Sequence, residues 1–375
     1  MKPVAIRISI FLATISLASC GGGGSGSSAQ PDTQYVYTTP EQRTDDWAVD
    51  SVASEGIDVA PLKSMMRAIS FERHDSFLKN ILIFKNNKLL FEEYFGTTNI
   101  STKAHMQSAT KSIVSTIFGI AKYNGFVASV DDSLFDYYPE YSHLNNADKE
   151  NISLHHVLSM TPGFDWNENS TPLFEFENDN IAAYSSRNYI EYGLRKELVS
   201  TPGASWNYNS ACPMFLAGII KNQTGIHLDE FGENFLFSPL GIQSVTWQYQ
   251  DDGLPLATGG LSLKPRDIAK IGQLFLDEGR WQGQQIIDPT WVQASLTAHI
   301  SIDDNTDYGY LWWTREVATH RLWYAAGYGG QYIFLVPAEE VMIVINANYT
   351  QDTDETGRQV NDIWNLLANY ILPSI

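Results

Sequence analysis

The sequence predicts an α/β protein in which one antiparallel sheet is built from both ends of the chain and flanked by helices, with an all-α lobe inserted between the ends. Three observations lead to this prediction. Residues 81–95 and 331–347 each read as two strands, the segment between them is mostly helical, and residues 360–371 carry apolar side chains at helical spacing. A final amphipathic helix needs a sheet to cover, so both ends should meet in one sheet.

The first twenty residues have the features of a secretory signal. Lys2 and Arg7 precede an apolar run that is too short to span a membrane. The sequence "LASC", which ends at Cys20, resembles the lipobox of bacterial lipoproteins, in which the cysteine becomes the lipidated N-terminus. We therefore expect a signal peptide at 1–19, a membrane anchor through lipid on Cys20, and a place in the bacterial cell envelope. Gly21 favours the periplasmic face of the outer membrane, and the alternative is a plain signal peptide.

A Gly/Ser-rich tether is expected at 20–44, before a folded domain at 45–372. Within that domain we expect a sheet lobe at about 45–107 and 300–372 and a helical lobe at about 108–299. The chain of 375 residues is 43% hydrophobic, enough for a large core, and its formal net charge of -19 argues against binding nucleic acid. With Cys20 lipidated, Cys212 is the one remaining thiol, and the apolar stretch after it predicts that it is buried.

The individual elements follow from local signals. Asn86 and Asn87 lie between two apolar runs and predict the turn of a hairpin, and a proline-containing turn joins the two strands of 331–347. The stretch "KPRDIAKIGQLFLDEG" predicts a helix with one apolar face that ends near Gly279. An active site is most simply placed at the seam between the two lobes.

Ser108 and Lys111 open a helix in "SATKSIVSTIFGIAKYNG". Residues i and i+3 lie on one helix face, so the Ser hydroxyl and the Lys amine can meet there. The free N–H groups at a helix start favour an oxyanion, and a lysine held away from water is a candidate base for the hydroxyl. A second Ser-x-x-Lys, Ser76 to Lys79, runs straight into a strand and is not expected to bring its two side chains together.

Six motifs in this order resemble the serine β-lactamase/penicillin-binding-protein superfamily: "SATK", "SMTPGFDW", "PGASWNYNSACPMFLAGII", "GGLSLKPRDIAKIGQLFLDEG", "YGYLWW" and "AGYGGQYIFLVP". The branch that they resemble most holds the class C-like esterases and 6-aminohexanoate-dimer hydrolase. The resemblance extends over about residues 45–372 and implies a β-lactamase/transpeptidase-like fold. Its specificity comes from the order in which the motifs occur together.

By this resemblance Tyr208 is the tyrosine of the second motif, Y-x-N. A phenol beside the Ser and the Lys can take the Ser proton and pass it to the leaving group. Ser210 stands where the motif has Asn, which weakens the case for β-lactam recognition. The overhanging loop of these enzymes falls on 163–170, where Trp166 is a candidate substrate contact.

The third motif, K-T-G, is assigned to Tyr328, Gly329 and Gly330, and these residues are expected to bind substrate. The N–H of Gln331 would then join the N–H of Ser108 in the oxyanion hole. The lysine that pairs with the carboxylate of β-lactams is absent.

These residues predict a serine hydrolase that forms an acyl-enzyme on an ester or small amide, with Ser108, Lys111 and Tyr208 as catalytic residues. No cofactor is implied, and the eight His show no metal-binding spacing. One alternative is a cell-wall D-alanyl-D-alanine-type peptidase or a β-lactamase. Another is a catalytically silent homologue that binds peptidoglycan or protein.

Overall fold

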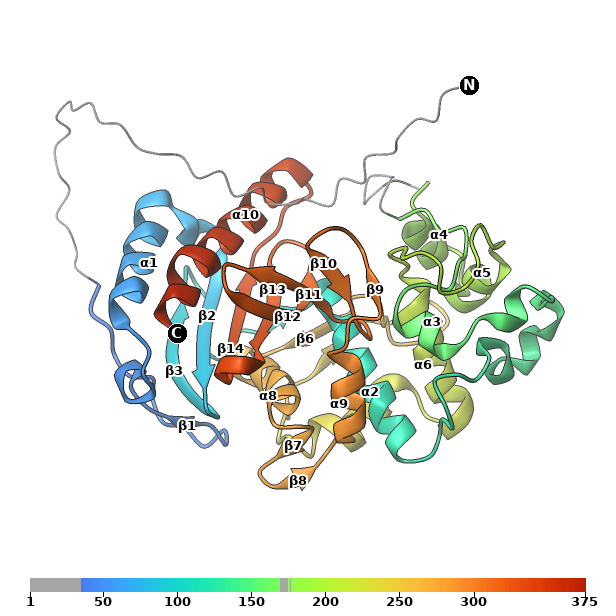
Figure 1. Cartoon of the computed structure of the whole chain (residues 1–375), viewed down its shortest axis with the longest axis horizontal. Helices are drawn as coiled ribbons and strands as arrows, with labels where there is room; N and C mark the ends of the chain where they lie inside the picture. The colour runs from blue at the N-terminus through green and yellow to red at the C-terminus, as the bar shows by residue number, and fades with distance from the viewer. Residues whose placement is uncertain (1–34, 169–174, 176) are drawn as a thin grey trace.

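A nine-stranded sheet forms the centre of the computed structural model, which describes residues 35–168, 175 and 177–375 (Figure 1). Its strand order is β1-β3-β2-β14-β13-β12-β11-β10-β9. All neighbours pair antiparallel except β1 with β3. The strands are β1 (Ala48–Val49), β2 (Leu78–Lys85), β3 (Lys88–Tyr94), β9 (Ile300–Ser301), β10 (Thr306–Tyr308), β11 (Trp313–Val317), β12 (His320–Gly327), β13 (Gln331–Val336) and β14 (Val341–Ala347).

The two ends of the chain meet where β2 pairs with β14. This pairing confirms the predicted fold class, and the antiparallel pairs β2–β3 and β13–β14 confirm both predicted hairpins. Asn86 and Asn87 have φ of 52° and 62°, and two left-handed residues in succession make the tight turn that suits the twist of a hairpin.

Helices cover both faces of the sheet. The helices α1 and α10 lie together on one face, on the left in Figure 1, where their apolar residues pack on the strands. On the other face α8 contacts β13 and β14. The described helices are α1 (Val59–Glu72), α2 (Thr110–Tyr123), α3 (Leu154–Leu158), α4 (Asp179–Ser185), α5 (Tyr189–Arg195), α6 (Ala211–Thr224), α7 (Leu228–Gly232), α8 (Pro265–Leu276), α9 (Pro289–Ser295) and α10 (Thr353–Leu366).

The structure assigns α8 differently from the lobes expected from the sequence. A Cβ on Gly272 of α8 would lie 2.4 Å from Met342 Sδ and 2.8 Å from an Ile333 methyl group, so this helix lies directly on the sheet. It therefore belongs to the sheet layers although it falls within 108–299. Residues of the expected tether also contact the sheet: Tyr37 donates its hydroxyl proton to the Leu90 carbonyl at 2.8 Å, and Tyr35 bonds Glu93.

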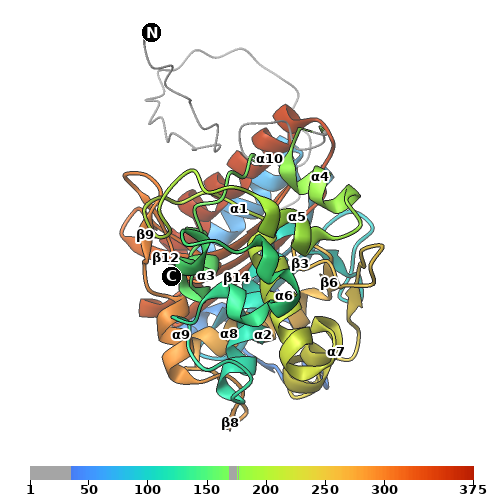
Figure 2. The same ribbon diagram turned by 90° about the vertical axis from the view of Figure 1, so that its right-hand side faces the viewer.

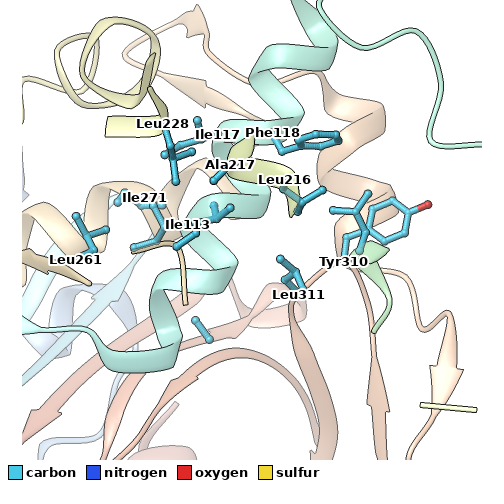
Figure 3. Close-up of a cluster of buried hydrophobic side chains, with 14 of the residues drawn as sticks. Ile113, Ile117, Phe118, Leu216, Ala217, Leu228, Leu261, Ile271, Tyr310 and Leu311 are labelled. Atoms are coloured by element: carbon cyan, nitrogen blue, oxygen red, sulfur yellow. The ribbon is translucent and has the colours of Figure 1, made fainter. Parts of the chain in front are cut away.

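The central helix α2 links the helical part of the molecule to the sheet. It contacts α6 on one side and β12 on the other, and Figures 1 and 2 show it in the middle of the molecule, with α6 beside it in Figure 2. Figure 3 shows Ile113, Ile117 and Phe118 of α2 in one cluster with Leu216 and Ala217 of α6. Twelve of its fourteen residues are buried, so α2 holds whatever precedes it in a fixed position.

Two small sheets complete the fold. The first joins β4 (Ala104–His105), β6 (Leu261–Leu263) and β5 (Thr246–Trp247), and the second joins β7 (Arg280–Trp281) and β8 (Gln284–Gln285). Within the described ranges no helix is both long and apolar enough to cross a membrane. The predicted signal peptide and Cys20 lie outside the described residues.

Candidate active site

Ser108 lies in a 3-10 turn, Gln107–Ala109, that leads directly into α2. Gln107 has a φ of 48°, a left-handed conformation that costs a residue with a side chain free energy. The residues that precede the turn are held by β6, because Met106 N donates to Leu261 O at 2.8 Å and β4 pairs with β6. The Ser108 hydroxyl therefore stands at a fixed point where the turn meets the buried helix.

Lys111 is buried one turn further on, with 3% of its surface exposed. Its Nζ donates to Ser108 Oγ at 3.0 Å and to the carbonyl oxygen of Thr258 at 2.6 Å. The same ammonium lies 5.0 Å from the centre of the Tyr208 ring, within the range of a cation–π interaction. The structure thus brings Ser108, Lys111 and Tyr208 together from positions up to a hundred residues apart.

Tyr208 comes just before α6, whose first residue is Ala211. Its ring stacks on Trp313 at 6.0 Å between centroids and 28° between planes, and it also contacts Trp206 at 6.1 Å. These two indoles fix the ring plane and so the direction of the phenol.

The end of β12 forms another wall of the site, beside the Ser108 turn. A Cβ on Gly327 would lie 2.2 Å from the Met106 carbonyl oxygen, so only glycine allows this strand to approach the Ser108 turn. Because β11 pairs with β12 only as far as Tyr324, residues 325–327 have no partner from β11 on that side. An extended substrate could lie along this edge.

These residues surround a cavity of about 610 Å³, a volume typical of small-molecule sites. Its walls carry aromatic and aliphatic groups together with a few polar ones. They comprise His105, Gln107, Ser108, Lys111, Glu168, Asn180, Ile181, Tyr184, Tyr208, Gln248, Leu256, Thr258, Gly259, Trp313, Ala326, Gly327, Tyr328 and Tyr349.

Glu168 places a buried carboxylate in this cavity. Its Oε2 accepts hydrogen bonds from the Trp166 indole at 2.8 Å and from the Ser210 backbone N–H at 2.9 Å, and its Oε1 accepts from the Ser210 hydroxyl at 2.7 Å. The side chain therefore ties the loop at 163–168 to the residue that precedes α6, two positions after Tyr208.

Of the five predicted substrate contacts, only Tyr328 is among the described residues that line the cavity. Trp166 and Ser210 are buried and turned toward Glu168. Gly329 packs against Tyr349 and Gly330 against Ile363, while Tyr328 lines the cavity.

Gln331 is not on the cavity wall either. It is the first residue of β13, and its side-chain amide donates to Ala347 O at 2.8 Å, on the side of β14. The Gly327 carbonyl oxygen accepts a hydrogen bond from Gly330 N at 3.2 Å, so this carbonyl points toward the β12–β13 turn. Backbone groups alternate sides along a strand, so the N–H groups of Ala326 and Tyr328 are directed to the other side, where the cavity lies.

Cys212 lies within α6 and is completely buried. Burial raises the pKa of its thiol far above the usual range, and the negative charge of Glu168 raises it further. A buried thiol with so high a pKa is a poor nucleophile.

Two residues of the site, Thr258 and Gly259, lie in a part of the sequence with little local indication of a role. The carbonyl of Thr258 binds Lys111 through a backbone atom, which any residue type would supply. Gly259, next to it, passes within contact distance of Gln107, and the Gly-Gly pair before the strand 261–263 was the one available signal.

Comparisons with known proteins show the family of the chain. The Beta-lactamase family model matches residues 80–363. The chain is 25% identical over 281 residues to 6-aminohexanoate-dimer hydrolase of Paenarthrobacter ureafaciens, covering 70% of each chain.

Two solved structures share the fold. A putative 6-aminohexanoate-dimer hydrolase from Bacillus anthracis has a TM-score of 0.63 at 19% identity, over 90% of this chain and 89% of that one. EstCE1, a hydrolase with promiscuous acyltransferase activity, has a TM-score of 0.65 at 14% identity, over 83% and 99%. The family model covers well over half of the chain, and the protein therefore belongs to the Beta-lactamase family of β-lactamase-fold hydrolases.

Proposed function

We propose that the protein is a serine hydrolase that cleaves an ester or small amide through an acyl-enzyme on Ser108. The observation that carries this proposal is the 3.0 Å contact between Lys111 Nζ and Ser108 Oγ at the wall of the cavity. A nucleophile and its base within hydrogen-bond reach are what acyl transfer requires.

In the proposed reaction Ser108 Oγ attacks the substrate carbonyl while Lys111 and Tyr208 share its proton. The C–O or C–N bond then breaks, and the same proton passes to the leaving group. Water repeats the sequence on the acyl-enzyme and releases the acid, with Ser108 restored.

The negative oxygen formed at each attack would be held by two backbone N–H groups. We propose the N–H of Ser108 and, in place of Gln331, the N–H of Tyr328. The support for Tyr328 is its position on the cavity wall and the alternation of backbone direction along β12. Each such donor is worth roughly 3 kcal/mol of transition-state stabilisation.

The test combines a covalent probe with turnover. A fluorophosphonate should label the wild type and leave Ser108→Ala unlabelled, and the wild type should hydrolyse 4-nitrophenyl butyrate. Ser76→Ala is the matched control, because Ser76 belongs to the other Ser-x-x-Lys, in which Lys79 is part of β2. Equal labelling of wild type and Ser108→Ala would refute the proposal.

A fluorescent penicillin, used beside the fluorophosphonate and the ester, separates the alternatives. Labelling of Ser108 by a fluorescent penicillin, without ester turnover, would favour a cell-wall peptidase. Absence of labelling by either probe would favour a silent binding homologue.

We further propose that the protein is a lipoprotein anchored through Cys20 at the periplasmic face of the outer membrane. The support is the basic, apolar and "LASC" pattern of residues 1–20. Labelled palmitate should be incorporated by the full chain and not by Cys20→Ser, and release of the variant into the soluble periplasm would agree. Equal incorporation by both proteins would refute this anchor.

A further inference from the structure

A second cavity of about 210 Å³ lies on the other side of Trp313 from Tyr208, between β10–β12 and α10. Its walls are mainly aromatic and include one arginine. They comprise Ile302, Asp303, Thr306, Trp313, Arg315, Tyr324, Ala326, Tyr332, Val360 and Trp364. The volume is enough for the end of a small molecule and too small for a second complete substrate.

Arg315 brings a positive charge to this cavity. Its guanidinium lies 5.1 Å from the Trp364 ring, and its Nε is buried with no hydrogen-bond acceptor among the residues that the structure describes. Among these described residues, no carboxylate oxygen lies within 4.0 Å of a nitrogen of the Arg315 guanidinium. Burial raises the pKa of Tyr324 and of Tyr332, and the charge of Arg315 opposes that rise at both phenols, while the charge of Asp303 adds to it at Tyr324.

Asp303 is the one acidic residue among the described residues of the same wall. Its carboxylate accepts a hydrogen bond from the Asn305 N–H at 2.9 Å, within the turn that contains both residues. Asp303 forms no ion pair with Arg315 within 4.0 Å. A guanidinium is well suited to bind a carboxylate through two parallel hydrogen bonds.

The second cavity adjoins the catalytic one. Trp313 and Ala326 line both cavities. The Trp313 ring stacks on Tyr208 on the catalytic side and on Tyr324 on the other, the latter at 6.3 Å and 13°. The two cavities are therefore neighbours, separated by the Trp313 indole and the Ala326 methyl group.

We propose that this cavity binds a carboxylate carried by the substrate at a distance from the scissile bond, with Arg315 as the specificity-determining residue. The inference rests on the proposed function, since it names the class of substrate for the Ser108 site. The preferred substrate is then an ester or amide with an anionic end, held by Arg315 and packed against Trp364 and Tyr324.

The turnover experiment compares carboxylated and neutral esters. One series is the 4-nitrophenyl monoesters of adipic to suberic acid against their methyl diesters, and the other is 4-butyryloxybenzoate against its methyl ester. The wild type should prefer the carboxylated member of at least one series through a lower KM. Arg315→Gln should raise that KM roughly 10- to 100-fold and leave the neutral esters within about twofold.

Two further variants control for charge and folding. Arg315→Lys keeps the charge without the planar fork and should be intermediate. Arg321→Gln removes an arginine that is paired with Asp307 on the same sheet, outside the cavity, and should behave as wild type. Circular dichroism and melting temperature check that each variant is folded.

A binding measurement separates this inference from the proposed function. Suberate should change the tryptophan fluorescence of Ser108→Ala, because Trp313 and Trp364 line the cavity, and should not do so when Arg315→Gln is added. If no ester is cleaved, the proposed function is refuted. The fluorescence change with suberate then still tests whether the second cavity binds a carboxylate through Arg315. Equal KM values for charged and neutral esters in the wild type overturn the inference, even where free suberate binds.

Discussion

Lys111 donates a hydrogen bond to the carbonyl of Thr258, a residue 147 positions further along the chain, at 2.6 Å. This bond and the 3.0 Å contact with Ser108 hold the ammonium between the helix α2 and the loop that precedes β6. The Lys111 ammonium is therefore oriented by a backbone carbonyl and held beside the Ser108 hydroxyl.

Replacing the reacting groups should abolish activity while the fold remains intact. Ser108→Ala, Lys111→Ala and Tyr208→Phe are each expected to lower kcat by about a thousandfold or more, because groups that act as a unit fail together. The double variant Ser108→Ala/Lys111→Ala should be no worse than either single one. Turnover of 4-nitrophenyl butyrate and thermal melting measure the two effects, and a multiplicative loss in the double variant would contradict a shared role.

Gly327→Ala should disable the site through the backbone. The new Cβ would lie 2.2 Å from the Met106 carbonyl oxygen, so the strand end or the Ser108 turn must move. We expect a loss of about 1–3 kcal/mol in the free energy of unfolding and a lower kcat.

Gly96→Ala provides the control for Gly327→Ala. Gly96 has a φ of 62° and no atom within 4 Å of an added Cβ, so the substitution should cost about 1 kcal/mol of stability with no change in kcat. A Gly327→Ala enzyme with wild-type kcat would show that the close approach is unimportant.

Glu168→Ala should destabilise the protein and lower its activity. It leaves three donors on Trp166 and Ser210 without their acceptor in a buried place, at a cost of about 2–4 kcal/mol. Glu168→Gln keeps an acceptor for the Trp166 and Ser210 N–H groups and should retain most of the stability, with activity within about tenfold of wild type. Urea denaturation and kcat separate the two variants, and equal stability of both would argue against this role.

The histidines on and near α3 should make the protein less stable in acid. His155 bonds the Tyr310 hydroxyl at 2.8 Å and packs edge-on against His299, and burial lowers the pKa of both imidazoles below the ordinary value of 6.5. The unfolded chain then binds more protons than the folded one, so stability is complete above pH 6.5 and falls as the pH drops below it.

His299→Phe tests this pH dependence, because it keeps an aromatic ring beside Tyr310 and removes one titrating group. Its free energy of unfolding should fall less steeply between pH 7 and 5 than that of the wild type. Parallel curves for the two proteins would contradict the assignment.

The sequence by itself determined the features that depend on neighbours within a few residues. Asn86 and Asn87 predicted their hairpin because both accept left-handed φ, and the apolar spacing of 110–123 predicted the buried helix that carries Lys111. The contact between Ser108 and Lys111 also followed, since three positions along one helical turn bring side chains together.

Only the tertiary structure decided which distant groups lie beside Ser108. Ser210 was expected to face the substrate and is turned to Glu168, and the wall beside Ser108 is formed by Gly327 and Tyr328, with Gln331 directed to β14. Strand register and the side to which each backbone group points are set by pairing between segments far apart in the chain, and a shift of one residue reverses the side. The carbonyl of Thr258 and the guanidinium of Arg315 enter their cavities in the same way, through packing that no local pattern records.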